Sequence, residues 1–209
     1  MTLSYNEVAA RGLERIAALS DGVFAIAMTL IVFEIRVPDP GVIRTDQDLW
    51  AAMVALGPRL ITYLLSFLTL GIFWTGQQTQ SHYFARSDRH LAWLQLAFLA
   101  AVALMPFSTS LLAEFITLRP ALIAYWANIV LLGVLIYASW RYARHAGLVK
   151  ADAPVGLSGA ITRRVVVAQA LYALGAAIGL ISPAWGIAFI VIVQLNFAIA
   201  PRIGILARF

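Results

Sequence analysis

A single aspartate inside an apolar stretch is the first residue of this sequence that could do chemistry. Asp21 stands beside Ser20 in RIAALSDGVFAIAMTLIVFEIRVP, where most neighbours are small or aliphatic. A carboxylate placed in hydrocarbon costs about 2.5–3.5 kcal/mol on insertion scales, so such residues have partners or a function. Asp21 is therefore predicted either to act in the function of the protein or to be held by hydrogen bonds from a neighbouring helix.

The rest of the sequence gives little indication of a catalytic or metal-binding site. The sequence has no HExxH, CxxC, glycine-rich phosphate loop or GxSxG with partners, and it contains no cysteine. His82, His90 and His145 fall in polar connections, where solvation is a simpler prediction than zinc binding. Asp21 has no second deep aspartate with which to share a proton, as an acid protease requires. We expect no enzyme activity, no cofactor and no resident metal.

The composition defines the elements that must position Asp21. Hydrophobic residues make up 62% of the chain, charged residues only 12%, and mean hydropathy is +0.85, far from the composition of a soluble domain. One helical crossing needs about 20 apolar residues, so 209 residues hold one membrane domain, 1–209. We predict an all-α membrane protein of six transmembrane helices at about 16–37, 51–80, 91–115, 120–140, 165–181 and 185–203. The longest polar connection, RYARHAGLVKADAPVGLSGAITRR, is predicted to be a solvent-exposed loop that can contain a short amphipathic piece.

Basic residues predict the orientation of these helices, because short loops rich in Lys and Arg remain in the cytoplasm. One side keeps only Arg36, Arg44, Arg59 and Arg119. The opposite side, which includes both termini, carries Arg11, Arg15, Arg86, Arg89, Arg141, Arg144, Lys150, Arg163, Arg164, Arg202 and Arg208. Both termini are therefore predicted to be cytoplasmic. This orientation explains the net charge of +5 without a nucleic-acid partner.

The first predicted helix has two different sides. With about 100° between successive residues, Ile26, Leu30 and Phe33 lie at about 140°, 180° and 120° from Asp21 and form one bulky stripe. The side of Asp21 is smaller and suits packing against other helices; it also carries Ala25, Met28 and Val32, and Val37 extends the bulky stripe. Taken alone, such a stripe is more typical of a surface facing lipid or a protein core than of a pore.

Two segments together resemble the transmembrane protein 175 family of lysosomal and prokaryotic potassium channels. In RIAALSDGVFAIAMTL, Arg15, Ser20 and Asp21 match the first-helix motif, and Leu19 stands where that family has phenylalanine. The segment SFLTLGIFWTGQQTQSHYFARSDRHLAWLQLAFLAAVALMPFSTSLL is similar to the second and third helices of the family. Gln77 and Gln78 stand where relatives often carry histidine or asparagine. The resemblance covers about residues 15–112.

The resemblance implies a potassium-permeable cation channel. It implies six helices per repeat and, for a chain with one repeat, a homotetramer around a central pore lined by the first helix. The pore constriction would be Ile26, followed by Leu30 and Phe33, with Thr29 supporting selectivity. The sequence lacks a TVGYG filter, as the family does, so we expect only modest preference for potassium over sodium. Thr29 has an equally good alternative, a hydrogen bond to the carbonyl one helical turn back.

A structural network is the role we expect for Asp21 and the residues of its motif. Pointing away from the stripe, Asp21 would join Ser20 in hydrogen bonds with the second helix, where the nearest donors are Trp74, Gln77 and Gln78. Arg15 is predicted to reach the cytoplasmic interface or to pair with a carboxylate. Four acidic residues are expected near the outer end of the helices: Glu34, Asp39, Asp46 and Asp48. We predict that they are solvated loop residues, in preference to a role in raising the local concentration of cations.

Two other classes of protein remain compatible with the sequence. A secondary transporter would also have six helices, although the inverted repeats and matching broken helices typical of such folds are not evident here. A non-conducting membrane scaffold would need only helices that pack. For the channel, we expect potassium and similar monovalent cations and the lipid bilayer as partners. We also expect the multi-pass chain to lie in the plasma membrane of a prokaryote.

Overall fold

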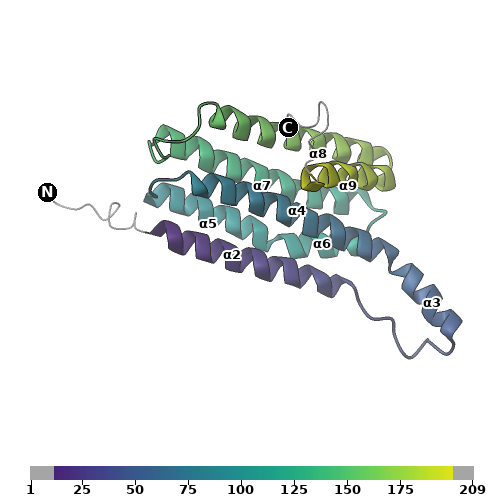
Figure 1. The fold of residues 1–209 in the computed structure, drawn as a ribbon. Helices are drawn as coiled ribbons and strands as arrows, with labels where there is room; N and C mark the ends of the chain where they lie inside the picture. The colour runs from purple at the N-terminus through teal and green to yellow at the C-terminus, as the bar shows by residue number, and fades with distance from the viewer. Residues whose placement is uncertain (1–11, 200–209) are drawn as a thin grey trace.

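The computed structural model describes residues 12–199, and its regular elements in this range are helices (Figure 1). They are α2 (Leu13–Leu30), η2 (Ile31–Glu34), α3 (Asp46–Ala55), α4 (Gly57–His82), α5 (Arg89–Ala103), α6 (Met105–Glu114), α7 (Arg119–His145), α8 (Leu157–Ile181) and α9 (Pro183–Ile199). The helix α2 runs along one edge of the bundle and packs against α4, α5 and α6, while α8 and α9 lie on the other side. The short helix α3 extends past the end of α4, away from the bundle.

Prolines mark where several helices begin. Pro58, Pro106 and Pro120 each stand within the first two residues of a helix, in α4, α6 and α7. At these positions the missing N–H leaves no intrahelical hydrogen bond unmade. Pro106 therefore divides the third predicted span into α5 and α6, which meet at Leu104. The start of α5 uses a side chain instead, because Asp88 Oδ1 accepts a hydrogen bond from the Leu91 N–H at 2.8 Å.

Five segments of the described chain are long and apolar enough to cross a membrane, over residues 13–34, 57–82, 89–114, 119–145 and 157–181. The sixth predicted crossing, 185–203, corresponds to α9, whose 17 helical residues make it shorter than the other five. The last part of that prediction lies outside the described residues, as do Arg11, Arg202 and Arg208. Six crossings remain a prediction.

Several predicted boundaries differ from the structure, and one is the end of the fourth helix, because α7 continues to His145 instead of ending at Trp140. The first helix ends at Glu34 rather than Val37, because the proline at position 38 disfavours helical backbone in the residue before it. The second spanning helix begins at Gly57 rather than 51, since residues 46–55 form the separate helix α3. The fifth begins at Leu157 rather than 165, directly after Gly156 with its φ of 90°.

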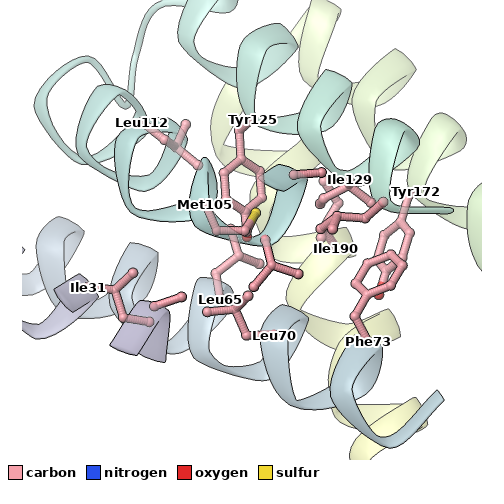
Figure 2. Close-up of a cluster of buried hydrophobic side chains, with 14 of the residues drawn as sticks. Ile31, Leu65, Leu70, Phe73, Met105, Leu112, Tyr125, Ile129, Tyr172 and Ile190 are labelled. Atoms are coloured by element: carbon pink, nitrogen blue, oxygen red, sulfur yellow. The ribbon is translucent and has the colours of Figure 1, made fainter. Parts of the chain in front are cut away.

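The bundle encloses an apolar core that draws on all its long helices. Figure 2 shows Leu65 and Leu70 from α4, Met105 from α6, Ile129 from α7 and Ile190 from α9, each fully buried. Polar groups within this core have partners on other helices. Tyr125 Oη lies 3.0 Å from Thr69 Oγ1 and 3.3 Å from Ser66 Oγ, as expected where water is excluded.

A second, smaller core lies at the end of the bundle where the basic connections meet. Phe84 and Leu148 are both 4% exposed, and Phe84 stacks on Trp140 at a centroid distance of 6.2 Å. An isolated β-bridge joins Phe84 to Val149, and the Ala85 N–H donates to the Leu148 carbonyl at 2.8 Å. The sequence predicted a solvent-exposed connection after α7. In the structure, part of this connection is packed into the smaller core.

Candidate pore helix and its contacts

The helix α2 packs into its own chain through one narrow face. The residues of this face recur every three or four positions and are at most 2% exposed: Ser20, Phe24, Ala27 and Ile31. Phe24 contacts Phe98 of α5, with ring centroids 6.0 Å apart. The side of Asp21 was expected to be the packing side, yet Ala25 and Val32 are exposed. Phe24, which directly precedes Ala25 and lies about 100° from it around the helix, occupies the interior position instead.

The bulky stripe of α2 is the face that the chain leaves uncovered. Ile26 is 61% exposed, Leu30 44% and Phe33 72%, and α2 itself lies at an edge of the bundle (Figure 1). Apolar side chains of this size need a covering of lipid or protein. The structure therefore places the three predicted constriction residues together on one free surface of the chain.

The end of the stripe has a tighter geometry than a regular α-helix. The α-helix ends at Leu30, and Ile31–Glu34 form the 3₁₀ helix η2. A 3₁₀ turn holds about 3 residues, so side chains three apart lie nearly in line. Phe33 therefore sits closer to the line of Leu30 than the expected 120° position. Val37 lies beyond the helix, so it does not extend the stripe as predicted.

Thr29 bonds to its own helix. Its Oγ1 donates within 2.8 Å of the Ile26 carbonyl oxygen and lies 3.0 Å from that of Ala25. Thr29 is exposed on the same side of α2 as Ile26. The hydroxyl hydrogen is thus taken up by the helix, and the hydroxyl oxygen keeps its capacity to accept a hydrogen bond.

Asp21 is held by two donors from one face of α4. Trp74 Nε1 donates to Asp21 Oδ1 at 3.0 Å, and Gln78 Nε2 donates to the same oxygen at 2.6 Å. Trp74 and Gln78 are four residues apart, so one turn of α4 presents both side chains together. These contacts lie on the flank of α2, away from the Ile26 stripe, and they link the rotation of α2 to α4.

Gln77 belongs to a separate chain of buried hydrogen bonds one residue from Gln78. Ser20 Oγ donates to Gln77 Oε1 at 2.9 Å, and Gln77 Nε2 donates to Gln95 Oε1 at 3.1 Å. The three side chains are at most 3% exposed, so each of these hydrogen bonds replaces water that cannot reach the polar atoms. Ser20, Gln77 and Gln95 come from α2, α4 and α5, and their hydrogen bonds join these helices at one level.

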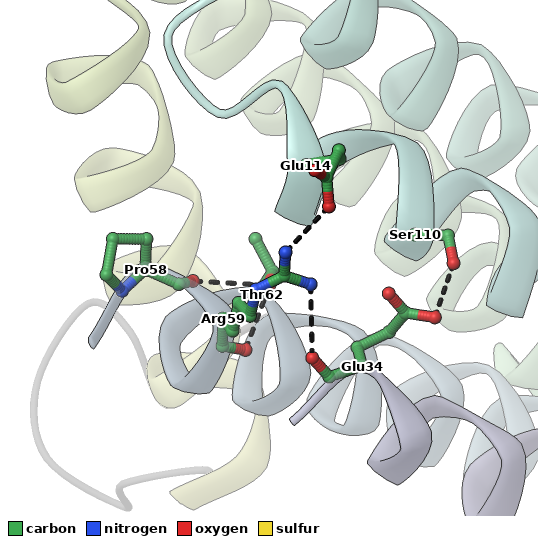
Figure 3. A network of polar contacts seen from close by, with 6 residues as sticks. All are labelled: Glu34, Pro58, Arg59, Thr62, Ser110 and Glu114. Atoms are coloured by element: carbon green, nitrogen blue, oxygen red, sulfur yellow. Dashed lines mark hydrogen bonds and ion pairs between the residues drawn. The ribbon is translucent and has the colours of Figure 1, made fainter. Parts of the chain in front are cut away.

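The other end of α2 is fixed by an arginine from α4 (Figure 3). Arg59 Nη2 lies 2.6 Å from Glu114 Oε2 of α6, and Arg59 Nη1 donates to the Glu34 carbonyl oxygen at 3.4 Å. The Glu34 carboxylate in turn accepts a hydrogen bond from Ser110 Oγ. The end of η2 is therefore tied to both α4 and α6.

The remaining predicted polar residues lie apart from these contacts. Arg15 is exposed, and no carboxylate among residues 12–199 pairs with it. Asp39 accepts a hydrogen bond from the Gly41 N–H at 2.8 Å. Hydrogen bonds from the Thr45 side chain and from the N–H groups of Arg44 and Thr45 lower the pKa of Asp48. Within the described range, no three acidic, His or Cys side chains gather as metal ligands.

Sequence reasoning missed two parts of this arrangement. Gln95 is the last acceptor in the buried series of hydrogen bonds. The sequence feature that could have revealed it is a lone glutamine in the apolar run WLQLAFLAAVAL. The pairing of Arg59 with Glu114 was missed because the two residues are 55 positions apart. Glu34 was expected to be solvated, although its carboxylate is bonded to Ser110.

The sequence and the fold match known channels. Residues 15–106 match the model of the family described as endosomal/lysosomal potassium channel TMEM175. A potassium channel of Streptomyces collinus is 36% identical over 150 residues, which cover 67% of this chain and 70% of the relative. The human endosomal/lysosomal proton channel TMEM175 is 36% identical over 100 residues, which cover 46% of this chain and 20% of the human protein.

A solved structure agrees over nearly the whole length. The crystal structure of a lysosomal potassium-selective channel TMEM175 homologue from Chamaesiphon minutus superposes with a TM-score of 0.76 at 28% identity. The match covers 90% of this chain and 97% of that one. The fold and the sequence thus match those of a multi-pass membrane channel family, and the chain belongs to the TMEM175 family of potassium channels.

Proposed function

We propose that the protein is a potassium-permeable cation channel in which four chains surround a pore lined by α2. The observation that carries this proposal is the uncovered stripe of Ile26, Leu30 and Phe33 on a helix that packs into its own chain through another face. The names of the bacterial relatives point to potassium. The number of chains follows from the family resemblance, because this chain has one repeat.

The constriction would act through its apolar character. Four Ile26 side chains around an axis form a ring that excludes water when narrow and admits ions when slightly wider. Leu30 and Phe33 would form further rings toward the outer end, with Phe33 nearly in line with Leu30. A ring of this kind offers no full set of oxygen ligands in place of the hydration shell. We therefore propose a modest preference for potassium over sodium, with Thr29 as a supporting residue.

The network around Asp21 would position the pore helix. Asp21 is bonded by Trp74 and Gln78 on the flank of α2, and Ser20 is bonded to Gln77. Both contacts resist rotation of α2 about its axis, and rotation would carry Ile26 out of the ring. Arg15 would meet the headgroups at the cytoplasmic end of α2.

Membrane placement completes the proposal. The apolar helix α9 would be the sixth crossing, which leaves both termini in the cytoplasm, and the membrane would be the plasma membrane of a prokaryote. The two basic connections lie side by side at one end of the bundle, joined by the bridge between Phe84 and Val149. This arrangement supports a common cytoplasmic side for them.

Ion flux from liposomes tests the proposed function. Purified protein should release potassium and rubidium faster than sodium, exclude a large organic cation, and give unitary current steps in planar bilayers. Light scattering in detergent should give the mass of four chains. Saturable flux coupled to a counter-ion, without current steps, would favour a secondary transporter. Liposomes as tight as empty ones would favour a non-conducting scaffold.

A further inference from the structure

A basic hollow lies at the end of the bundle where α7 finishes and α5 begins. Toward the middle of the bundle it is lined by Leu94 and Ala138. Toward the end of α7 it is lined by Arg141, Tyr142, Arg144 and His145. Its volume of about 790 Å³ is far larger than a single inorganic anion needs. The hollow belongs to neither α2 nor its contacts, so the proposed pore does not account for it.

The positive charge of this hollow is not neutralised within the described chain. Asp88 is hydrogen-bonded to Tyr142 of the lining, and its single negative charge cannot balance both Arg141 and Arg144. Oδ1 accepts from the Leu91 N–H at 2.8 Å and Oδ2 from the Tyr142 hydroxyl at 2.6 Å. Arg141 and Arg144 are exposed and form no ion pair with another residue in 12–199. Because Asp88 ties the start of α5 to the end of α7, this corner also includes three further exposed basic side chains: Arg86, Arg89 and His90.

The part of the hollow nearer the middle of the bundle is apolar and belongs to membrane-spanning helices. Leu94 and Ala138 belong to helices α5 and α7, which are both apolar enough to span a bilayer. Trp93, the neighbour of Leu94, is 62% exposed, and tryptophan is typical of the boundary between headgroups and hydrocarbon. A soluble anion would gain nothing from these apolar groups, whereas a molecule with both a charged head and an apolar tail would contact both sides of the hollow.

We propose that this hollow binds an anionic phospholipid, with its phosphate at Arg141 and Arg144 and its acyl chains along Leu94 and Ala138. Guanidinium groups form charge-assisted hydrogen bonds with phosphate oxygens in a bidentate fashion. Basic hollows between spanning helices on the cytoplasmic side are suited to anionic headgroups. His145 adds a further donor at the rim. Lipid binding at this corner does not depend on whether the protein conducts ions.

Native mass spectrometry of the purified protein tests this proposal, because it counts lipids bound to folded protein. Phosphatidylglycerol and phosphatidylcholine with the same acyl chains should be added in turn, and a third sample should contain phosphatidylglycerol together with inorganic phosphate at equal concentration. The wild type should retain phosphatidylglycerol in preference to phosphatidylcholine. The double substitution Arg141→Ala and Arg144→Ala should weaken that binding about tenfold or more, since each basic residue contributes about 1 kcal/mol near an anionic lipid.

Arg119→Ala provides the matched control, because Arg119 is an exposed arginine at the opposite end of α7. It should leave phosphatidylglycerol binding unchanged. Unchanged binding in the double variant would overturn the proposal, as would equal retention of phosphatidylcholine by the wild type. Inorganic phosphate that competes off the lipid at equal concentration would also overturn it, because the hollow would then be a site for free anions.

Discussion

The two faces of α2 differ sharply in how far the rest of the chain covers them. Phe24 is 1% exposed and contacts an aromatic ring of α5, whereas Ile26, two residues later, is 61% exposed. Both are large apolar side chains in the same membrane-spanning helix. The difference teaches that hydrophobicity alone does not assign a role in such a helix. The packed face fixes where α2 stands in its own chain, and the free face is the one that we propose for assembly and conduction.

Truncation of the packed face should have the largest effect on stability. Phe24→Ala removes a buried aromatic side chain and leaves a cavity, which costs about 3–5 kcal/mol. Ile26→Ala removes exposed atoms and should change the free energy of unfolding of the single chain by about 0.5 kcal/mol or less. Denaturant titration in detergent, under conditions that keep the chain monomeric, measures both. Equal losses for the two variants would break the distinction between the faces.

Removal of the Asp21 carboxylate should have the next largest effect. Asp21→Ala leaves Trp74 Nε1 and Gln78 Nε2 without their shared acceptor. Hydrogen bonds to charged groups contribute about 1.5–3 kcal/mol, and the partial exposure of Asp21 favours the lower end. Asp21→Asn keeps an acceptor oxygen and should lose less.

The Asp21 variants also test the positioning role, through the amount of tetramer recovered by gel filtration. We expect Asp21→Ala to yield less tetramer than wild type, and Asp21→Asn to fall between them. A normal yield of tetramer with altered ion selectivity in Asp21→Ala would contradict that role. Asp21 would then have to act on the ion itself.

The ion pair at the other end of α2 should have the smallest effect. Arg59 and Glu114 are 21% and 50% exposed in their side chains, and exposed pairs contribute about 0.2–1 kcal/mol. Glu114→Gln should lower the unfolding free energy by that amount, less so at high salt. Glu14→Gln, which changes an exposed acid at the start of α2, is the control. A loss of about 3 kcal/mol or more would show that this end holds α2 as firmly as the packed face does.

The elements of the fold were more predictable than their ends. Long apolar runs predict spanning helices because lipid leaves the backbone no other hydrogen-bonded form. The ends of the helices depend on one or two local residues, and these predict a boundary less clearly than a long apolar run predicts a helix. Pro58 marks the start of α4, but the apolar residues of α3 before it extended the predicted helix to 51. At the start of α8, Arg163 and Arg164 suggested a loop, although charged residues at the end of a long helix can reach water.

Single-helix geometry predicted the stripe of Ile26, Leu30 and Phe33 but not the face that packs. The spacing places residues relative to one another on α2, whereas the interior position is decided by which side chain fits against α5. The same limit applies to α4. Gln77 was named with Trp74 and Gln78 as a donor to Asp21, yet about 100° of rotation separates Gln77 from Gln78. That rotation takes Gln77 to Ser20 and Gln95 instead.

Potassium flux through proteoliposomes containing Ile26→Asn tests the central claim most directly. Val134→Asn is the matched control, because Val134 is 56% exposed on the membrane-spanning part of α7, away from the proposed pore. We predict that Ile26→Asn leaks faster or loses its preference for potassium over sodium, while Val134→Asn conducts like wild type. Unchanged flux and selectivity in Ile26→Asn, or the same change in both variants, would contradict a constriction formed by the free face of α2.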